Sequence, residues 1–282
     1  MTQASTRLFG SDNRYRLFTA VKYLTYILLS INVYMFLQEE LSALNFTFAG
    51  ALEPGQIIQS FSATIDTSAW VLLLLLFELE TSVLDDSKIR GPLKLFLHGI
   101  RGLCYVAIAY AFSGYYAELL TVYDVALQPG LDACSLLGQE FSQLIGQDKY
   151  LALGSDNCAA MGAEIYRLVG FDIIADSKTL HAVQWLAWTD IANSAAWIGV
   201  VIVLEIEVRL QLRGGISDKI MQVNKAIKLV LYALLFLAAV YWGYAGDFLD
   251  FWDASLWLFA FIFIELNIFE WQHETNQGLA SE

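Results

Sequence analysis

Six stretches of mostly apolar residues divide the chain, and shorter polar segments separate them. They cover residues 18–38, 67–84, 93–117, 185–206, 226–246 and 253–270. A helix needs about 20 mostly apolar residues to cross a bilayer. Hydrophobic residue types make up 57% of the chain and charged types only 16%, which is too apolar for an ordinary soluble domain. The pattern therefore predicts an all-α polytopic membrane protein with six transmembrane helices.

The basic residues predict how these helices are oriented. Thirteen of the 16 Lys and Arg residues lie near the N-terminus and around the second and fourth connections between apolar stretches. Lys and Arg concentrate in short cytoplasmic loops. We therefore expect an integral protein of a bacterial inner membrane or plasma membrane, with both termini cytoplasmic and the long connection 123–180 outside. A cleaved signal peptide ending near Ala49 and Ala51 is the alternative for the first stretch. Its length and the intervening Glu39 and Glu40 favour a retained helix.

A short motif recurs in the second, fourth and sixth stretches. It consists of an Asp or Asn, a tryptophan four positions later, and one or two acidic or amide side chains eight and ten positions after the tryptophan. The three copies are Asp66, Trp70, Glu78 and Glu80; Asn193, Trp197, Glu205 and Glu207; and Asp253, Trp257, Glu265 and Asn267. The other three stretches share a basic residue followed four positions later by tyrosine, at Lys22, Arg101 and Lys228. This alternation predicts three tandem helical hairpins, in residues 1–84, 85–210 and 211–282.

The outer end of this motif has a structural interpretation. Asp and Asn are common helix N-caps, and tryptophan is enriched at membrane interfaces. The glutamates are harder to explain, because twelve residues after the cap places them roughly 18 Å below the outer surface. An ionisable group at that depth needs a partner or water. Glu78 and Glu80 lie about 200° apart around a helix, so we expect them to face different neighbours.

Equal depths in antiparallel neighbours suggest how the charges are neutralised. We predict ion pairs of Lys22 with Glu78, Arg101 with Glu205, and Lys228 with Glu265. Snorkelling of the basic side chains to the inner headgroups is the alternative. Pairing of this kind would leave Glu80 and Glu207 for contact with an ion or a partner protein.

The long connection 123–180 is the only sizeable aqueous segment in the sequence. Apolar residues at helical spacing around 136–145 and 161–169 predict a small helical cap over the second hairpin. Cys134 and Cys158 both lie in this segment, on the oxidising side, which predicts a disulfide between them. Cys104 lies within an apolar stretch and is interpreted as a core residue.

Composition excludes several functions. The net charge of −13 argues against a nucleic-acid partner, and the three histidines do not fall where two could bind one haem. No catalytic motif and no metal-binding spacing is recognisable, so we expect no enzyme activity and no cofactor.

Two kinds of function fit the repeated charges. In the first, the protein is a cation- or proton-conducting channel or transporter, with an ion path lined or gated by Glu78, Glu80, Glu205, Glu207, Glu265, Asn267, Asp190 and Asn193. In the second, it is a non-catalytic accessory, scaffold or assembly subunit, in which these side chains contact a second copy or another membrane protein. We favour transport because the intramembrane carboxylates recur three times.

Overall fold

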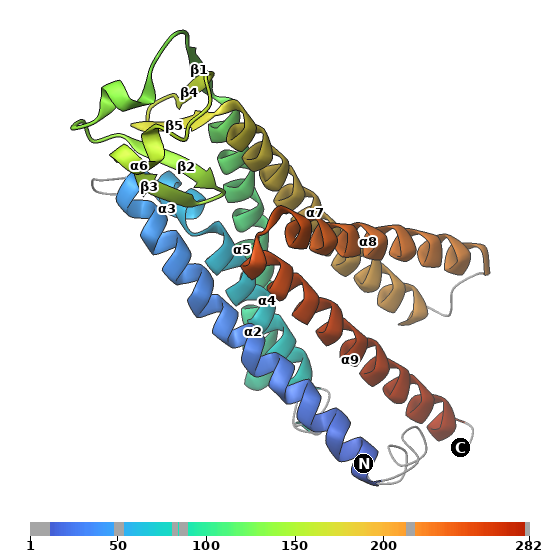
Figure 1. The fold of residues 1–282 in the computed structure, drawn as a ribbon. Helices are drawn as coiled ribbons and strands as arrows, with labels where there is room; N and C mark the ends of the chain where they lie inside the picture. Colours follow the sequence, from blue (N-terminus) through green and yellow to red (C-terminus); the bar gives the residue numbers. More distant parts are fainter. Residues whose placement is uncertain (1–11, 48–53, 81–83, 85–89, 213–217, 280–282) are drawn as a thin grey trace.

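The structure is a computed structural model, and it describes residues 12–47, 54–80, 84, 90–212 and 218–279. Within these ranges some side chains at helix ends are left out, including all those of residues 264–279. The fold is mostly helical, with 77% of the described residues in helices, and a small β-sheet caps one end (Figure 1).

Six long helices correspond to the six apolar stretches. They are α2 (Asp12–Thr47), α4 (Ser62–Glu78), α5 (Pro92–Tyr123), α7 (Ser177–Leu212), α8 (Asp218–Ala245) and α9 (Phe248–Leu279). A short helix, α3 (Pro54–Ser60), precedes α4.

Four of these helices, α2, α5, α7 and α8, are long and apolar enough to cross a membrane. The expectation of six spans is therefore only partly met. Helix α4 has 17 residues as described, and the side chains of α9 are described only as far as Phe263. The expected spans at 67–84 and 253–270 thus fall partly outside the described residues.

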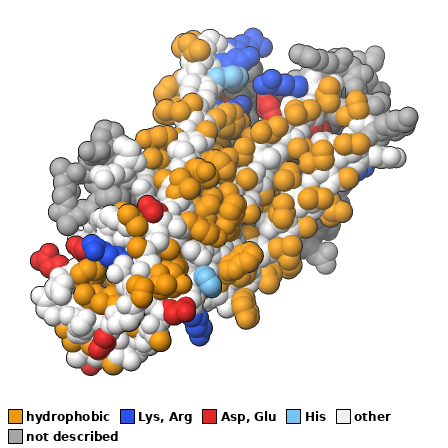
Figure 2. Space-filling view, turned by 90° about the horizontal axis from the view of Figure 1, so that it is seen from above, with side chains coloured by type: hydrophobic (Ala, Val, Ile, Leu, Met, Phe, Trp, Pro, Cys, Tyr) orange, Lys and Arg blue, Asp and Glu red, His pale blue; other side chains and the backbone are white. Residues whose placement is uncertain are grey.

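The helices pack as a closed series. Each packs against the next along the chain, from α2 through α4, α5, α7 and α8 to α9, and α9 packs against α2. Helix α2 begins and α9 ends at the side opposite the sheet (Figure 1). On the face seen in Figure 2, hydrophobic side chains cover the middle of the helices and charged side chains gather towards the ends. This distribution is compatible with a membrane protein.

Glycine is needed at two positions of the bundle, one in a tight turn and one where helices approach closely. Gly246 has a φ of 85° in the tight turn between α8 and α9, a conformation that side chains other than glycine rarely adopt. A Cβ atom at Gly114 of α5 would lie 2.6 Å from the carbonyl oxygen of Ile58 in α3 and 2.9 Å from Cβ of Ser62. Helices α3, α4 and α5 therefore meet at backbone distance beside the sheet.

The connection between α5 and α7 forms a five-stranded sheet. The strands are β1 (Val125–Gln128), β2 (Ser142–Gly146), β3 (Lys149–Ala152), β4 (Ile165–Leu168) and β5 (Ile173–Asp176), in the order β1-β4-β5-β2-β3. All neighbours are antiparallel except β2 and β5. A 3₁₀ turn, η2 (Ala133–Leu136), and a helical turn, α6 (Ser155–Cys158), complete the cap.

This sheet shows that the prediction of an all-α fold with a helical cap is wrong. The segments 136–145 and 161–169 contain strands β2 and β4 instead of helices. Buried Ser142 and Leu144 alternate with more exposed neighbours, which is the two-residue period of a strand. Short apolar runs fit the spacing of a helix as well as that of a strand. Here β2 and β4 both pair with β5, and this pairing makes the two segments strands.

The disulfide between Cys134 and Cys158 is confirmed, and it joins η2 to α6 in the cap. A second contact fixes the cap to the bundle. Buried Leu144, Leu168 and Ile173 of the sheet pack against Leu119 of α5 and Val183 of α7. The cap therefore packs directly on the ends of α5 and α7.

Candidate functional site

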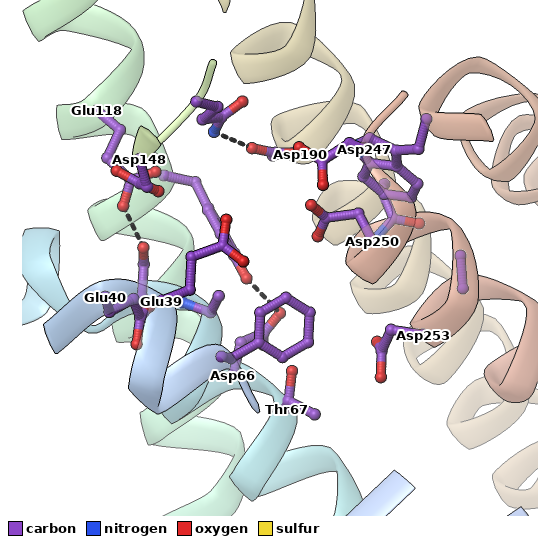
Figure 3. A pocket seen from close by; sticks show the side chains of 18 of the residues that line it. Glu39, Glu40, Asp66, Thr67, Glu118, Asp148, Asp190, Asp247, Asp250 and Asp253 are labelled. Atoms are coloured by element: carbon purple, nitrogen blue, oxygen red, sulfur yellow. Dashed lines mark hydrogen bonds between the residues drawn. The ribbon is translucent and has the colours of Figure 1, made fainter. Parts of the chain in front are cut away.

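A polar cavity lies among the helices on the side of the sheet, with a volume of about 80 Å³. We call it the acidic chamber, because nine of its lining residues carry carboxylates. They are Glu39, Glu40, Asp66, Glu118, Asp148, Asp190, Asp247, Asp250 and Asp253. No described lining residue is basic. Figure 3 shows the labelled carboxylates around a common space, contributed by helices on both sides.

These carboxylates come from every part of the bundle. Helix α2 supplies two, α4, α5 and α7 supply one each, and α9 supplies two. Asp247 lies in the turn between α8 and α9, and Asp148 lies in the turn between β2 and β3. The chamber therefore exists only in the assembled fold, which explains why no single stretch of sequence identifies it.

Three of the motif residues are chamber residues, and their predicted role as N-caps is wrong. Helix α4 begins at Ser62 and α7 at Ser177, so Asp66 and Asn193 lie within helices. Asp253 likewise follows the start of α9 at Phe248. The helices extend further towards the sheet than their apolar stretches do; in α7, buried Leu180 and Val183 pack against the cap there. All three motif residues line the chamber instead.

Several chamber carboxylates have specific donors. Glu40 accepts hydrogen bonds from the backbone amides of Ala63 and Thr64, at 2.8 and 3.2 Å, and thereby caps α4. Asn32 donates to Asp253 at 2.8 Å, which joins α2 to α9. These two acids have a structural role that accounts for their burial.

Asp66 is less well satisfied. Asp66 is 8% exposed; its carboxylate interacts with the Trp70 side chain, and the Tyr115 hydroxyl reaches Oδ2 only at 3.4 Å. Its Oδ1 atom is buried and accepts no hydrogen bond from the part of the chain that the structure describes. A buried carboxylate oxygen without a donor costs free energy unless a ligand, water or a proton satisfies it.

The turn between β2 and β3 adds charge to the chamber. Lys149 Nζ lies 2.9 Å from Asp247 and 3.2 Å from Glu39. Burial lowers the pKa of Lys149, but its hydrogen bond and charge attraction to Asp247, and then to Glu39, outweigh this and raise the pKa to about 12. Burial, followed by repulsion from Glu39, raises the pKa of Asp148 to about 6 despite the nearby Lys149. Lys149 is therefore a firmly charged ammonium beside an excess of carboxylates.

The three motif tryptophans also line the chamber. Trp197 lies 6.0 Å from both Trp70 and Trp257 between ring centroids, and Trp70 lies 6.5 Å from Trp257. Their predicted position in an interfacial aromatic belt is wrong, because they pack on one another inside the bundle. Edge-to-face contacts of this kind are favourable for aromatic rings. We call this cluster the tryptophan floor of the chamber.

Near the opposite ends of the helices, acidic side chains meet bases. Lys22 pairs with Glu78 at 2.7 Å as expected, with both side chains less than 10% exposed. The hydroxyls of Tyr23 and Tyr26 also donate to Glu78, at 3.1 and 3.4 Å. A buried pair with these additional donors has the satisfied geometry that such burial requires.

Of the other two predicted pairs, one is wrong and one lies outside the described residues. Arg101 pairs with Glu80 and not with Glu205, which binds Arg209 on its own helix and is half exposed. Lys228 pairs with Glu207 at 2.8 Å. Its predicted pair with Glu265 falls on a side chain outside the described residues and stays a prediction. The reason is topological, because the connections after α4 and α7 bring each of these helices beside the next one along the chain, α5 and α8.

This pairing also changes the expected ion path. Glu80 and Glu207 were expected to remain free, but each is bound to a base. Glu78 faces α2 and Glu80 faces α5, as their separation around the helix predicts. The side chains of Glu265 and Asn267 lie outside the described residues.

The cysteines and acids give no preformed metal centre within the described ranges. There, no three His, Cys, Asp or Glu side chains are arranged to hold a metal ion. Cys104 is buried and free. The chamber carboxylates are thus spread around a space, and their arrangement suits a proton, a monovalent ion or a hydrated cation better than a dehydrated metal ion.

No protein-family model, curated protein or solved structure matches this chain.

Proposed function

We propose that this chain is an integral membrane protein that takes up a cation from the outer side of the membrane through the acidic chamber. The observation that carries the proposal is the charge imbalance of the chamber: nine carboxylates line it, and none of its described lining residues is basic. Such a cavity concentrates cations and repels anions. The unsatisfied Oδ1 atom of Asp66 gives a cation or proton a specific place to bind.

The proposal includes six transmembrane helices arranged as three hairpins. Helices α4 and α9 each pack between other long helices, and four of the six are candidate spans by length and composition. The excess of basic residues near the helix ends away from the sheet supports a cytoplasmic location for that side. The sheet, its disulfide and the acidic chamber then face the outside.

Transport, rather than binding alone, is our preferred activity. The chamber lies at the sheet end of the bundle, and the tryptophan floor lies beside it. Beyond the tryptophan floor, a cation would reach the end of the bundle away from the sheet. There Glu80 and Glu207 are already paired with Arg101 and Lys228. We therefore propose that the protein alternates between conformations, because the described residues of this closed arrangement offer no continuous row of free carboxylates.

The tryptophan floor also supports the second candidate function. A chamber closed by three packed indole rings can bind a cation or a basic partner segment without passing it on. In that case the protein is an accessory or assembly subunit of a larger membrane complex.

Ion flux into liposomes that contain only the purified full chain distinguishes the two functions. We expect entry of K⁺, Na⁺ or H⁺ down an imposed gradient, measured with an ion-sensitive dye in the lumen. The variant Asp66→Asn should lose most of this flux. Glu205→Gln provides a matched control, because Glu205 is a half-exposed acid paired on its own helix. Absence of flux for every cation, with reproducible copurification of another membrane protein, would favour the accessory function.

The orientation has its own test. A single cysteine introduced at position 150 should react with an impermeant maleimide added to intact cells, and one at position 94 should not. Tyr150 lies in the cap, and Lys94 lies in the first turn of α5 at its other end. The reverse labelling pattern would reject the proposed topology.

A further inference from the structure

One hairpin of the cap reaches into the charged region of the bundle. Strands β2 and β3 are joined by a two-residue turn, Gln147 and Asp148, and both turn residues line the acidic chamber. Strand β2 packs against α7, and β3 packs against α2. The tip of the hairpin thus lies between two helices that belong to different parts of the chain.

The tip is held by carboxylates of three different elements. Lys149 Nζ contacts Glu39 of α2 at 3.2 Å and Asp247 of the α8–α9 turn at 2.9 Å. The Gln147 side chain donates to Asp190 of α7. All three acceptors are chamber carboxylates, and Asp247 is 6% exposed.

The backbone of the hairpin is shaped for this contact. Asp148 has a φ of 53°, an unusual conformation for a residue other than glycine. Gly146 faces Lys149 across the turn, and a Cβ atom there would lie 3.2 Å from the Lys149 side chain. A larger residue at 146 would therefore displace the lysine stem from its path towards the chamber.

Among the described residues, the Lys149 ammonium is thus the cation already held at this site. Its two carboxylates come from α2 and the α8–α9 turn, and it neutralises part of an otherwise unbalanced cluster. A monovalent cation that enters the chamber from the cap side competes for these same oxygens.

We propose that Lys149 is a tethered competitor for the cation, and that the β2–β3 hairpin is the gate of the chamber. A monovalent cation of the ammonium or alkali type displaces Lys149 from Glu39 and Asp247, and the hairpin tip then moves away from the helices. This gate rests on the proposed uptake of a cation, and it adds what controls access to the same site.

Hydrogen–deuterium exchange of the purified full chain tests the gate directly. Peptides covering 142–152 should exchange several-fold faster in potassium chloride or methylammonium chloride than in N-methylglucamine chloride of equal ionic strength. Peptides covering β1 and β4 in the same cap provide the control and should not respond. Exchange of 142–152 that is the same in all three salts would overturn the proposal.

Substitution of the lysine gives an independent test. Lys149→Gln should make the hairpin exchange fast in every salt, whereas Lys149→Arg should restore the cation dependence. The exposed Lys178 supplies the control variant Lys178→Gln. Cation binding, followed by the fluorescence of the chamber tryptophans, should be tighter in Lys149→Gln, by about tenfold if the closed hairpin occupies about 90% of molecules. Equal affinity and equal exchange in Lys149→Gln and the wild-type chain would reject the gate.

The outcomes separate the gate from the proposed function. A hairpin that opens with cations in a protein without flux supports the gate and removes the transport function. Flux with a hairpin that never responds to cations or to Lys149→Gln does the reverse.

Discussion

The carboxylates at the two ends of the helical bundle differ in their partners. Away from the sheet, Glu78, Glu80 and Glu207 each contact a Lys or Arg on a neighbouring helix. Beside the sheet, nine carboxylates surround one cavity, and Lys149, which contacts two of them, is their one basic partner among the described residues. The first arrangement resembles a set of structural ion pairs, and the second leaves negative charge available for a ligand. A carboxylate within a membrane helix is therefore a functional candidate only after its partners are known.

The largest expected effect concerns the buried pair at the end away from the sheet. Glu78→Gln leaves Lys22 buried without its counter-ion, so we expect a loss of about 3 kcal/mol or more in the free energy of unfolding in detergent. The double variant Lys22→Met with Glu78→Gln should recover much of this loss. Glu205→Gln, at a half-exposed acid, should change it by less than about 1 kcal/mol. Equal losses in Glu78→Gln and Glu205→Gln would show that pairing does not stabilise this end.

The second prediction concerns the covalent link at the sheet end. Replacing both Cys134 and Cys158 by serine opens a loop with a sequence separation of 24 residues. The chain-entropy model gives a loss of about 3 kcal/mol, which we expect to appear in the cap. Proteolysis should cleave residues 125–176 of the variant much faster than the same segment of the wild-type chain. An unchanged cleavage rate would mean that contacts with α5 and α7 hold the cap without the disulfide.

The helices could be predicted from sequence, and the sheet could not. Each long helix contains an apolar stretch long enough to be recognised without knowledge of its tertiary contacts. The strands around Leu144 and Ile165 are four or five residues long. Runs this short fit the spacing of a helix as well as that of a strand, and their identity depends on partners far along the chain.

The candidate site could be predicted only in part. The recurring motif contains chamber residues such as Asp66 and Asp253, but their proximity to Glu118 or Asp247 depends on how all six long helices pack. Two ion pairs did have a sequence signal. Glu80 precedes Arg101 by 21 residues, and Glu207 precedes Lys228 by the same interval. This interval spans one short connection between consecutive helices. Each acid therefore pairs with a base on the helix that follows it, and not with the base predicted at equal depth in its own hairpin.

The third prediction uses the pH dependence of the chamber. Burial raises the pKa of Asp148 from 3.8 to about 6, so the folded state binds this proton more tightly than the unfolded chain does. Its contribution to stability is therefore greatest at low pH and is lost as the pH rises from about 4 to about 6. Asp148→Asn removes this loss and suits the positive φ.

The variant should accordingly gain stability relative to the wild-type chain across that pH range, by no more than about 2 kcal/mol. Each pKa unit corresponds to about 1.4 kcal/mol, and partial exposure to solvent weakens the effect. Unfolding followed at a series of pH values measures it. A constant difference between the two proteins from pH 4 to pH 7 would contradict the proposed repulsion among the chamber carboxylates.

The fourth prediction is the smallest change in stability, and it tests most directly whether the two ends of the bundle differ. Asp66→Asn makes the same kind of substitution as Glu78→Gln, an acid replaced by its amide, but at the sheet end. Because Oδ1 of Asp66 has no donor among the described residues and Tyr115 reaches Oδ2 only at 3.4 Å, the loss of its charge breaks no ion pair in that part of the chain. We therefore expect the free energy of unfolding to change by less than about 1 kcal/mol, or to rise, since an unpaired buried charge costs more than a neutral group. Binding of K⁺ or methylammonium, read from the fluorescence of Trp70, Trp197 and Trp257, should nevertheless weaken clearly. If Asp66→Asn destabilises the protein as strongly as Glu78→Gln and leaves cation binding unchanged, Asp66 is a structural residue and the two ends of the bundle do not differ in the way proposed.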